Sequence, residues 1–328
     1  MKILFNFLSV FFAFTSLTGL CSAYADETNP SSVENTSPPA SAQVTKNENG
    51  LWPKQILNLS SDARIITNAL LADKSQRILS LIDQKCFADG TVKEKYTIDI
   101  GKNNGDKTKR DDARTPEGIY VLLERKTPPE IPFVTYGSLA FTTNYPNYFD
   151  RFDKKTGSGI WLHSVPDTVP LTRGSRGCVV LRNNDIKKIE SSILLKKTFL
   201  VIDSKIKWVS TEEHDAEKAL AMKWLENWRA QWESQNINAY IENYSDEFKA
   251  PPYNKKTWYK HKADLKEKYK YVKVQFSEPN ILQVKKNFLF QFVQNYESDG
   301  HKDIGIKTLY VIKEGNSLRI AREDWSPL

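Results

Sequence analysis

Residues 159–164 read GIWLHS, and residues 174–181 read GSRGCVVL. The earlier segment is an apolar run that ends on His163. The later one is a glycine-bracketed turn that delivers Cys178 to the start of another apolar segment. Short apolar runs bounded by turn residues are typical of buried strands. We therefore expect two adjacent strands that bring His163 toward Cys178.

This pairing has the composition of a thiol-dependent active site. Thiol catalysis needs a thiolate, an imidazole to manage its proton, and donors aimed at the developing oxyanion. Cys178 and His163 supply the first two, and the backbone N–H groups of Gly177 and Cys178 can supply the third. Taken singly, a strand-end His is more often a satisfied polar residue and a Cys a buried core thiol. Together, this close in sequence, they favour a catalytic pair.

The surrounding chain reads as short strands with tight turns, which suggests a mostly antiparallel sheet. A polar loop at 101–114 leads into the last of these strands, and loops of this length are either mobile or functional. The expected strands lie at 69–72, 78–82, 96–100 and 119–123.

The spacing of the apolar residues changes after Trp208. Ala216, Leu220, Trp224, Trp228 and Trp232 recur every fourth residue, which predicts an amphipathic helix over 213–235 whose Trp face packs on a core. One helix followed by several strands describes a separate small α+β domain. We expect its strands at 272–276, 288–294, 307–312 and 318–320.

The N-terminus reads as an export signal. Lys2 precedes an apolar run, and the segment closes on Ala23-Tyr24-Ala25, a small-x-small cleavage pattern. A transmembrane anchor is the alternative, but polar residues interrupt the run, and Leu20 before Cys21 argues against a lipoprotein. The 328 residues have room for two domains. The expected organisation is a signal peptide at 1–25, a disordered tether at 26–50 rich in Ser, Thr, Asn and Pro, a catalytic domain at 51–210 and the α+β domain at 211–328.

Charge and cysteine content narrow the function classes. Signal cleavage removes one basic residue, so the formal net charge falls from +7 to +6, and a basic exported protein meets anionic envelope polymers. The charge is scattered, unlike the basic patch of a nucleic-acid-binding protein. After cleavage Cys86 and Cys178 remain, either as one disulfide or as one packed thiol, Cys86, and one working thiol, Cys178.

The motifs resemble the L,D-transpeptidase (YkuD) family, whose signature is His-Gly or His-Ser, a short spacer, then Ser/Thr-x-Gly-Cys and apolar residues. Here the signature reads His163-Ser164 and, after the spacer, SRGC at 175–178. The resemblance covers about 63–203, including TPEG at 115–118, and implies a mostly β catalytic domain with a YkuD-like β-sandwich. TNYPN at 143–147 and the last domain are similar to a subgroup of cell-shape L,D-carboxypeptidases, in which that domain resembles the nuclear-transport-factor-two cone fold.

The resemblance also implies a mechanism. The Cys178 thiolate attacks the carbonyl of diaminopimelate in a peptidoglycan stem tetrapeptide, expels the terminal D-alanine and leaves a thioester. His163 serves as base and then acid, and the backbone carbonyl at Ser164 orients the imidazole. If an amine of a second stem resolves the thioester, the product is a crosslink. If water resolves it, the enzyme acts as a carboxypeptidase. The features shared with the carboxypeptidase subgroup favour water.

Two departures from the family pattern affect substrate binding. Arg176 stands where many members carry a second His, and Val180 stands where many carry an Arg, the nearest here being Arg182. The resemblance implies that Arg176 and Arg182 bind substrate. The same role is expected of Asn144 and Tyr145.

The expected location is the periplasm, and the expected partners are peptidoglycan stem peptides rather than nucleic acid. We expect no membrane span after signal cleavage. The sequence identifies no protein partner. We expect no metal and no cofactor, because the four His residues are scattered without ligand spacing. A papain-like protease is disfavoured since its Cys precedes its His. A catalytically decayed wall-binding or scaffold protein remains the alternative from another class.

Overall fold

The computed structural model describes residues 45–46, 50–65 and 67–328. The predicted signal peptide lies outside these residues, as does the predicted tether except for Thr45, Lys46 and Gly50. Thr45–Lys46 form strand β1, which pairs with β6 (Thr91–Val92), so this short part of the expected tether has regular structure. Within the described residues no helix is long and apolar enough to cross a membrane.

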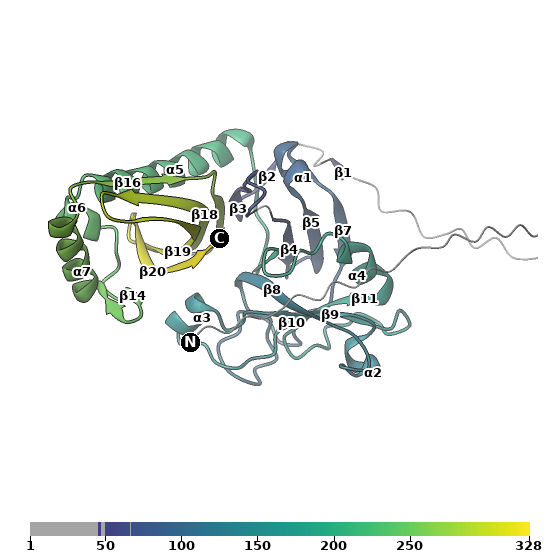
Figure 1. The fold of residues 1–328 in the computed structure, drawn as a ribbon. Helices are drawn as coiled ribbons and strands as arrows, with labels where there is room; N and C mark the ends of the chain where they lie inside the picture. The colour runs from purple at the N-terminus through teal and green to yellow at the C-terminus, as the bar shows by residue number, and fades with distance from the viewer. Residues whose placement is uncertain (1–44, 47–49, 66) are drawn as a thin grey trace, which may run out of the picture. The chain divides into compact units, whose positions relative to one another are not determined.

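The first part of the chain builds an eight-stranded sheet in the order β11-β10-β9-β8-β12-β4-β5-β7 (Figure 1). The pairs β10–β11 and β4–β12 are parallel and the others antiparallel, which confirms the expectation of a mostly antiparallel sheet. The strands are β4 (Ala69–Asp73), β5 (Ile78–Ile82), β7 (Glu94–Thr97), β8 (Gly118–Lys126), β9 (Ala140–Thr143), β10 (Trp161–Val165), β11 (Val179–Arg182) and β12 (Phe199–Asp203).

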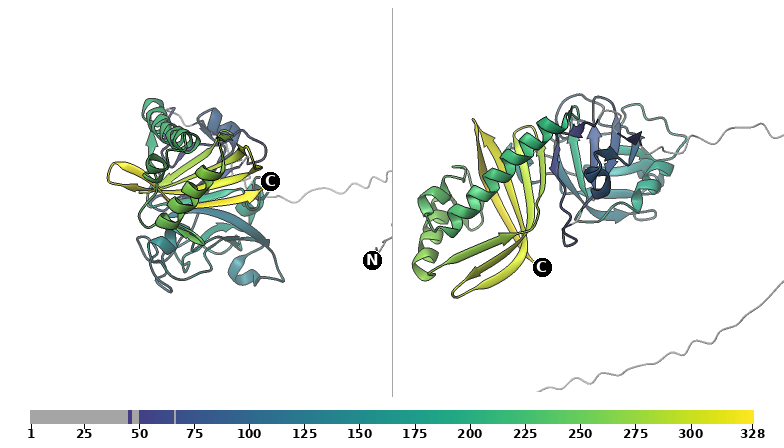
Figure 2. Two further views of the ribbon diagram at one scale, coloured as in Figure 1. Left: turned by 60° about the vertical axis from the view of Figure 1, so that its left-hand side comes forward. Right: turned by 90° about the horizontal axis from the view of Figure 1, so that it is seen from above.

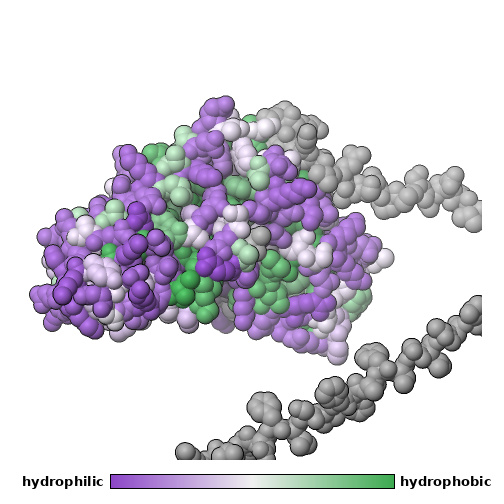
Figure 3. Space-filling view, turned by 45° about the horizontal axis from the view of Figure 1, so that its top comes forward, coloured by the Kyte–Doolittle hydropathy of each residue, from purple (hydrophilic) through white to green (hydrophobic). Residues whose placement is uncertain are grey.

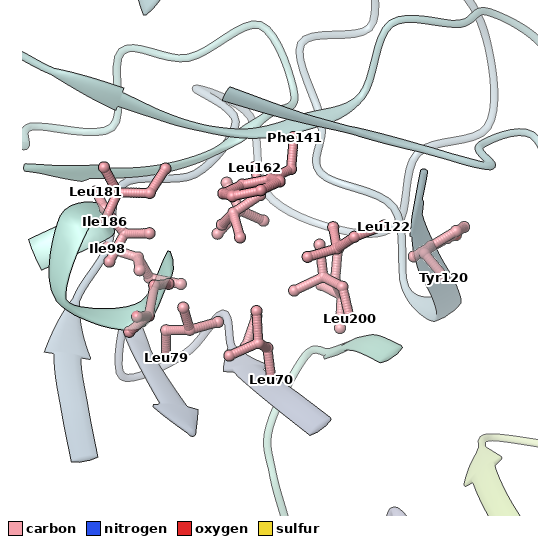
Figure 4. Packing of buried hydrophobic residues seen from close by; sticks show 14 of the residues in the cluster. Leu70, Leu79, Ile98, Tyr120, Leu122, Phe141, Leu162, Leu181, Ile186 and Leu200 are labelled. Carbon is pink, nitrogen blue, oxygen red and sulfur yellow. The ribbon is translucent and has the colours of Figure 1, made fainter. Parts of the chain in front are cut away.

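The two edges of this sheet meet, which encloses a core. Just after β7, Asp99 exchanges two backbone hydrogen bonds with Val180 of β11, at 2.8 and 2.9 Å. Side chains from β9, β10 and β11 thereby face those from β4, β5 and β12 across a closed apolar interior (Figure 4). Burying a Leu or Ile side chain contributes about 1.5–3 kcal/mol, so this interior fixes the strands that carry His163 and Cys178.

Four short helices interrupt the strand series: α1 (Gln84–Ala88), α2 (Phe133–Tyr136), α3 (Tyr148–Phe152) and α4 (Asn183–Glu190). Helix α1 was not predicted, and it begins because the Asp83 carboxylate accepts a hydrogen bond from the Cys86 N–H at 2.8 Å. Cys86 is buried in an apolar cluster with Phe87 and Val92. Both Cys86 and Cys178 are free thiols, so the disulfide alternative is wrong.

The last part of the chain forms a second sheet in the order β20-β19-β18-β17-β3, with β16 paired to β18. Strand β3 (Ile56–Asn58) comes from near the start of the predicted catalytic domain and pairs with β17. The four expected strand runs fall in β16, β18, β19 and β20, whereas β17 was missed. Their bounds are β16 (Val272–Phe276), β17 (Asn280–Val284), β18 (Asn287–Ser298), β19 (Lys302–Glu314) and β20 (Ser317–Pro327).

Helix α5 (Thr211–Glu233) lies along this sheet, as expected (Figure 2). The predicted stripe is partly wrong, because Ala216 is exposed and Leu220 is 69% exposed. An α-helix has 3.6 residues per turn, so positions spaced by four drift by about 40° at each step. The face that is buried instead consists of His214, Ala221, Leu225, Trp228 and Trp232.

Apolar packing and several short elements complete the two sheet-containing parts of the chain. The second sheet has an apolar cluster of its own with α5, around Trp228 and Phe290. A third cluster joins residues of both sheets, among them Val201 and Leu282. The face shown in Figure 3 is mostly hydrophilic with smaller hydrophobic areas. These elements are β2 (Trp52–Pro53), β13 (Trp208–Val209), α6 (Ile237–Ile241), β14 (Lys249–Ala250), β15 (Tyr253–Asn254) and α7 (Lys255–Lys268).

Candidate active site

The parallel pairing of β10 with β11 places His163 and Cys178 on one face. His163 lies opposite Val180, and Cys178 directly precedes β11. Alternate residues of a strand share a face, and residues in register on neighbouring strands point the same way. Cys178 and His163 accordingly line one cavity of about 480 Å³, whose other walls include Val165, Val169 and Leu171.

The imidazole of His163 is held in one tautomer. Its Nδ1 lies 2.8 Å from the Ser164 carbonyl oxygen, as the resemblance implied. A carbonyl only accepts, so Nδ1 carries the proton and Nε2 is the free basic nitrogen. His163 is 6% exposed, and the Tyr136 ring packs edge-on against it at 5.0 Å between centroids. Burial lowers the pKa of His163 below its usual range, and the hydrogen bond to Ser164 offsets only part of this.

The thiol of Cys178 lies between two backbone groups of the neighbouring segment. The Trp161 N–H donates to Sγ at 3.5 Å, and Sγ is 3.5 Å from the Gly159 carbonyl. Burial raises the pKa of the thiol, against the opposing effects of the Trp161 N–H and the charges of Arg176 and Lys107. Both shifts favour the uncharged forms, a thiol and an unprotonated imidazole, for the resting pair.

The turn before Cys178 is fixed by Asp99, a residue that was not among the predicted site residues. The Asp99 carboxylate accepts hydrogen bonds from the Arg173 N–H and, at 2.7 Å, from the Gly174 N–H. Its backbone pairs with Val180, so one buried residue holds both ends of the turn. The sequence feature that could have pointed to Asp99 is its place inside the apolar run 96–100. A carboxylate is buried in such a run only if it is hydrogen-bonded.

The turn requires a glycine at 177, and the Gly177 N–H is paired inside it. Its φ is +134°, and a Cβ there would lie 2.7 Å from the Arg114 carbonyl oxygen. Its N–H already donates to Ser175 Oγ at 3.1 Å, and that hydroxyl donates to the Cys178 carbonyl at 2.8 Å. The Gly177 N–H is thus already paired within the turn, which favours the Cys178 N–H as the oxyanion donor of the two. The oxyanion role expected of Gly177 stays a prediction.

A second cavity, of about 360 Å³, also reaches Cys178. Cys178, Arg176 and Tyr136 line both cavities. The second one is polar, because Lys107, Arg110 and Asp111 contribute to its wall. The thiol thus lies between a largely apolar cavity and a basic one. Arg176, a predicted substrate-binding residue, lines both cavities.

Three other predicted substrate-binding residues have structural partners instead. The Arg182 guanidinium donates to the backbone carbonyls of Asp167 and, at 3.1 Å, Val169, so it supports the loop that walls the cavity. Asn144 Oδ1 accepts the Val121 N–H at 3.0 Å. The Tyr145 hydroxyl donates to the Thr156 carbonyl at 3.0 Å.

Neither Asn144 nor Tyr145 is among the residues that line the two cavities described above. Tyr145 is 6% exposed and belongs to the core of the first sheet. Their expected contact with substrate is not supported, because both side chains turn toward the fold. Sequence pattern alone could not show which way they point.

Two segments of the chain match known protein families, and the whole fold resembles solved structures. Residues 67–202 match the family model described as the L,D-transpeptidase catalytic domain, YkuD, and residues 220–324 match the Cds6 C-terminal NTF2-like domain. The solved structure of Bd1075 from Bdellovibrio bacteriovorus is 46% identical, with a TM-score of 0.78, and the match covers 85% of this chain and 99% of that one. The chain belongs to the L,D-transpeptidase (YkuD) family.

Two further structures relate to this L,D-transpeptidase-family chain. The helical cell shape determining protein Pgp2 from Campylobacter jejuni is 27% identical, with a TM-score of 0.62 and coverage of 80% of this chain and 96% of that chain. Its K307A mutant is 26% identical, with a TM-score of 0.63 and coverage of 85% and 94%. No curated protein matches. The expected fold, a mostly β YkuD domain followed by an NTF2-like α+β domain, is confirmed.

Proposed function

We propose that this protein is a periplasmic cysteine enzyme that cleaves peptidoglycan stem tetrapeptides at diaminopimelate through a thioester on Cys178. The observation that carries the proposal is the placement of Cys178 and His163 in one cavity, with Nδ1 fixed by the Ser164 carbonyl. Family membership and the likeness to a cell-shape determining protein support the choice of peptidoglycan.

The chemistry follows from the neutral resting pair. As Sγ attacks the diaminopimelate carbonyl carbon, His163 Nε2 takes the thiol proton, and the Cys178 N–H donates to the oxyanion. The C–N bond to D-alanine then breaks while the imidazolium gives its proton to the leaving amine. The product is a thioester and free D-alanine.

The basic cavity supplies the charge that the substrate needs. The terminal D-alanine carries a carboxylate next to the bond that is cut, and Arg176 and Arg110 line the cavity beside Cys178. A guanidinium pairs with a carboxylate through two parallel hydrogen bonds. We assign carboxylate binding to this side, which replaces the roles expected of Asn144 and Tyr145.

Water is the proposed acceptor, so the enzyme trims tetrapeptides to tripeptides. Crosslinking requires a second stem held in near-attack geometry, whereas water requires no such site. This preference rests on TNYPN at 143–147 and on the NTF2-like domain, the two features that resemble the carboxypeptidase subgroup. A role in setting cell shape follows as part of the same proposal.

Incubation of the purified mature protein with disaccharide tetrapeptide, followed by mass spectrometry, tests this proposal. Disaccharide tripeptide and free D-alanine support trimming, whereas dimers joined between two diaminopimelate residues would assign crosslinking to the same thiol. No product, together with no labelling of Cys178 by a carbapenem, would favour a decayed wall-binding protein.

A further inference from the structure

The loop at 101–117 forms part of the support of the Cys178 turn. The Lys102 N–H donates to the Ser175 carbonyl at 2.9 Å, and Gly101 bridges Ser175. The Arg114 carbonyl lies against Gly177, where it leaves no space for a Cβ. The loop therefore contacts the turn at two points, one near each of its ends.

One buried lysine, Lys74, ties the first half of the loop to its last residues. Lys74 Nζ donates to the carbonyls of Gly105 and Thr115, at 2.7 and 2.8 Å, and to Glu117 Oε1 at 2.8 Å. An ammonium has three donors, and all three are used here. Asp106 closes the loop further, because its Oδ1 accepts the Glu117 N–H at 2.8 Å.

A residue of the NTF2-like domain completes this cluster. Lys285 occupies the tight turn between β17 and β18, with φ of +56°. Its Nζ lies 2.8 Å from Asp106 Oδ2 and 2.8 Å from Glu117 Oε2, so it bridges a carboxylate in the first half of the loop and the one at its end. Burial acts to raise the pKa of Glu117, but hydrogen bonds from Lys285 and Lys74 hold it below its usual range.

We propose that Lys285 is a positioning residue through which the NTF2-like domain sets the geometry of the Cys178 turn. Lys285 clamps Asp106 to Glu117, and the clamped loop presents the Lys102 N–H and the Arg114 carbonyl to Ser175 and Gly177. The NTF2-like domain is in this way a structural part of the active site. The inference rests on the proposed function only in treating the Cys178 turn as catalytic.

The neighbouring Lys286 provides a matched control. It belongs to the same turn, and the exposed fractions of the two side chains are similar, 47% for Lys285 and 51% for Lys286. Lys286 Nζ is 3.3 Å from Asp153 Oδ1, away from the loop carboxylates. Removing either lysine deletes one exposed charge, but only Lys285→Met removes the bridge between the Asp106 and Glu117 carboxylates. Lys155, whose Nζ lies 3.0 Å from Asp106 Oδ2, stays in place in both variants.

The experiment compares Lys285→Met, Lys285→Arg and Lys286→Met by hydrogen-exchange mass spectrometry and by the rate of iodoacetamide alkylation at Cys178. We expect Lys285→Met to speed exchange in 102–114 and 174–178 by about tenfold and to change the alkylation rate by about threefold or more. Lys285→Arg restores both readouts, and Lys286→Met leaves both within about twofold.

Other outcomes would overturn the proposal. Faster exchange confined to the hairpin at 280–290, with 102–114 and the alkylation rate unchanged, would make Lys285 a local brace. If Lys285→Met unfolds, Asp106→Asn removes the charge that binds both Lys285 and Lys155 from the loop side. Unchanged exchange in 174–178 in that variant would be equally negative. Neither readout requires peptide cleavage, so failure of the proposed function and failure of this inference are distinguishable.

Discussion

Replacing Gly177 with Ala tests whether the shape of the Cys178 turn determines reactivity. At a φ of +134° an L-residue is strained, and residues in such regions cost about 1–3 kcal/mol. The new Cβ would also lie 2.7 Å from the Arg114 carbonyl oxygen and 2.8 Å from Ile160 Cδ1. Ordinary C···O contacts begin near about 3.3 Å, so the turn must shift by about half an ångström or more.

The expected effect is larger on catalysis than on stability. Misplacing a reacting group by about 1 Å costs about 10²-fold in rate, so we expect D-alanine release to fall by about 10- to 100-fold. Strain and contact together predict a loss of about 2–4 kcal/mol in the free energy of unfolding. The measurements are the rate of D-alanine release from disaccharide tetrapeptide and urea unfolding.

Gly174→Ala is the matched control within the same turn. The nearest atom to a Cβ at Gly174 is Asp99 Oδ2, at 4.0 Å, and its φ is outside the strained range. This variant should keep its rate within about twofold and its stability within about 0.5 kcal/mol. Equal activity of the two variants would refute the argument that Gly177 positions the nucleophile.

The remaining predictions concern the resting pair. His163→Ala should slow acylation of Cys178 by a carbapenem by about 10²-fold or more, and an unchanged rate would mean that another group activates the thiol. Because the pKa of His163 is below its usual 6.5, acylation should decline only as pH falls beneath that range, where the imidazole protonates and stops acting as a base. Since the pKa of Cys178 is raised above 9.0, alkylation by iodoacetamide should keep rising with pH past 9.0. A plateau near neutral pH would instead indicate a thiolate–imidazolium pair.

Hydrophobic periodicity and one short motif were enough to predict the elements that hold the site. The apolar runs around His163 and Cys178 became β10 and β11, because strands buried on both faces read as continuous apolar segments. The contact between the His163 imidazole and the Ser164 carbonyl also followed from the resemblance, since it joins adjacent residues.

The features that the sequence could not predict depend on where side chains point and on contacts between residues far apart in the sequence. Whether the Gly177 N–H is free depends on the rotamer of Ser175, and Tyr145 turns into the core rather than the cavity. Ion pairs such as Lys285 with Asp106 join residues far apart in sequence, and no local pattern marks them. Strand β3 likewise pairs with β17 across most of the chain.

The measurement that tests the central claim most directly is D-alanine release from disaccharide tetrapeptide by Cys178→Ala, with Cys86→Ala as control. Deleting one thiol costs little packing, so Cys178→Ala should keep its fold by circular dichroism and lose all turnover. Cys86 is buried in the apolar cluster around Phe87, and Cys86→Ala should retain activity. Release of D-alanine by folded Cys178→Ala at the rate of the unaltered protein would contradict the assignment of Cys178 as the nucleophile.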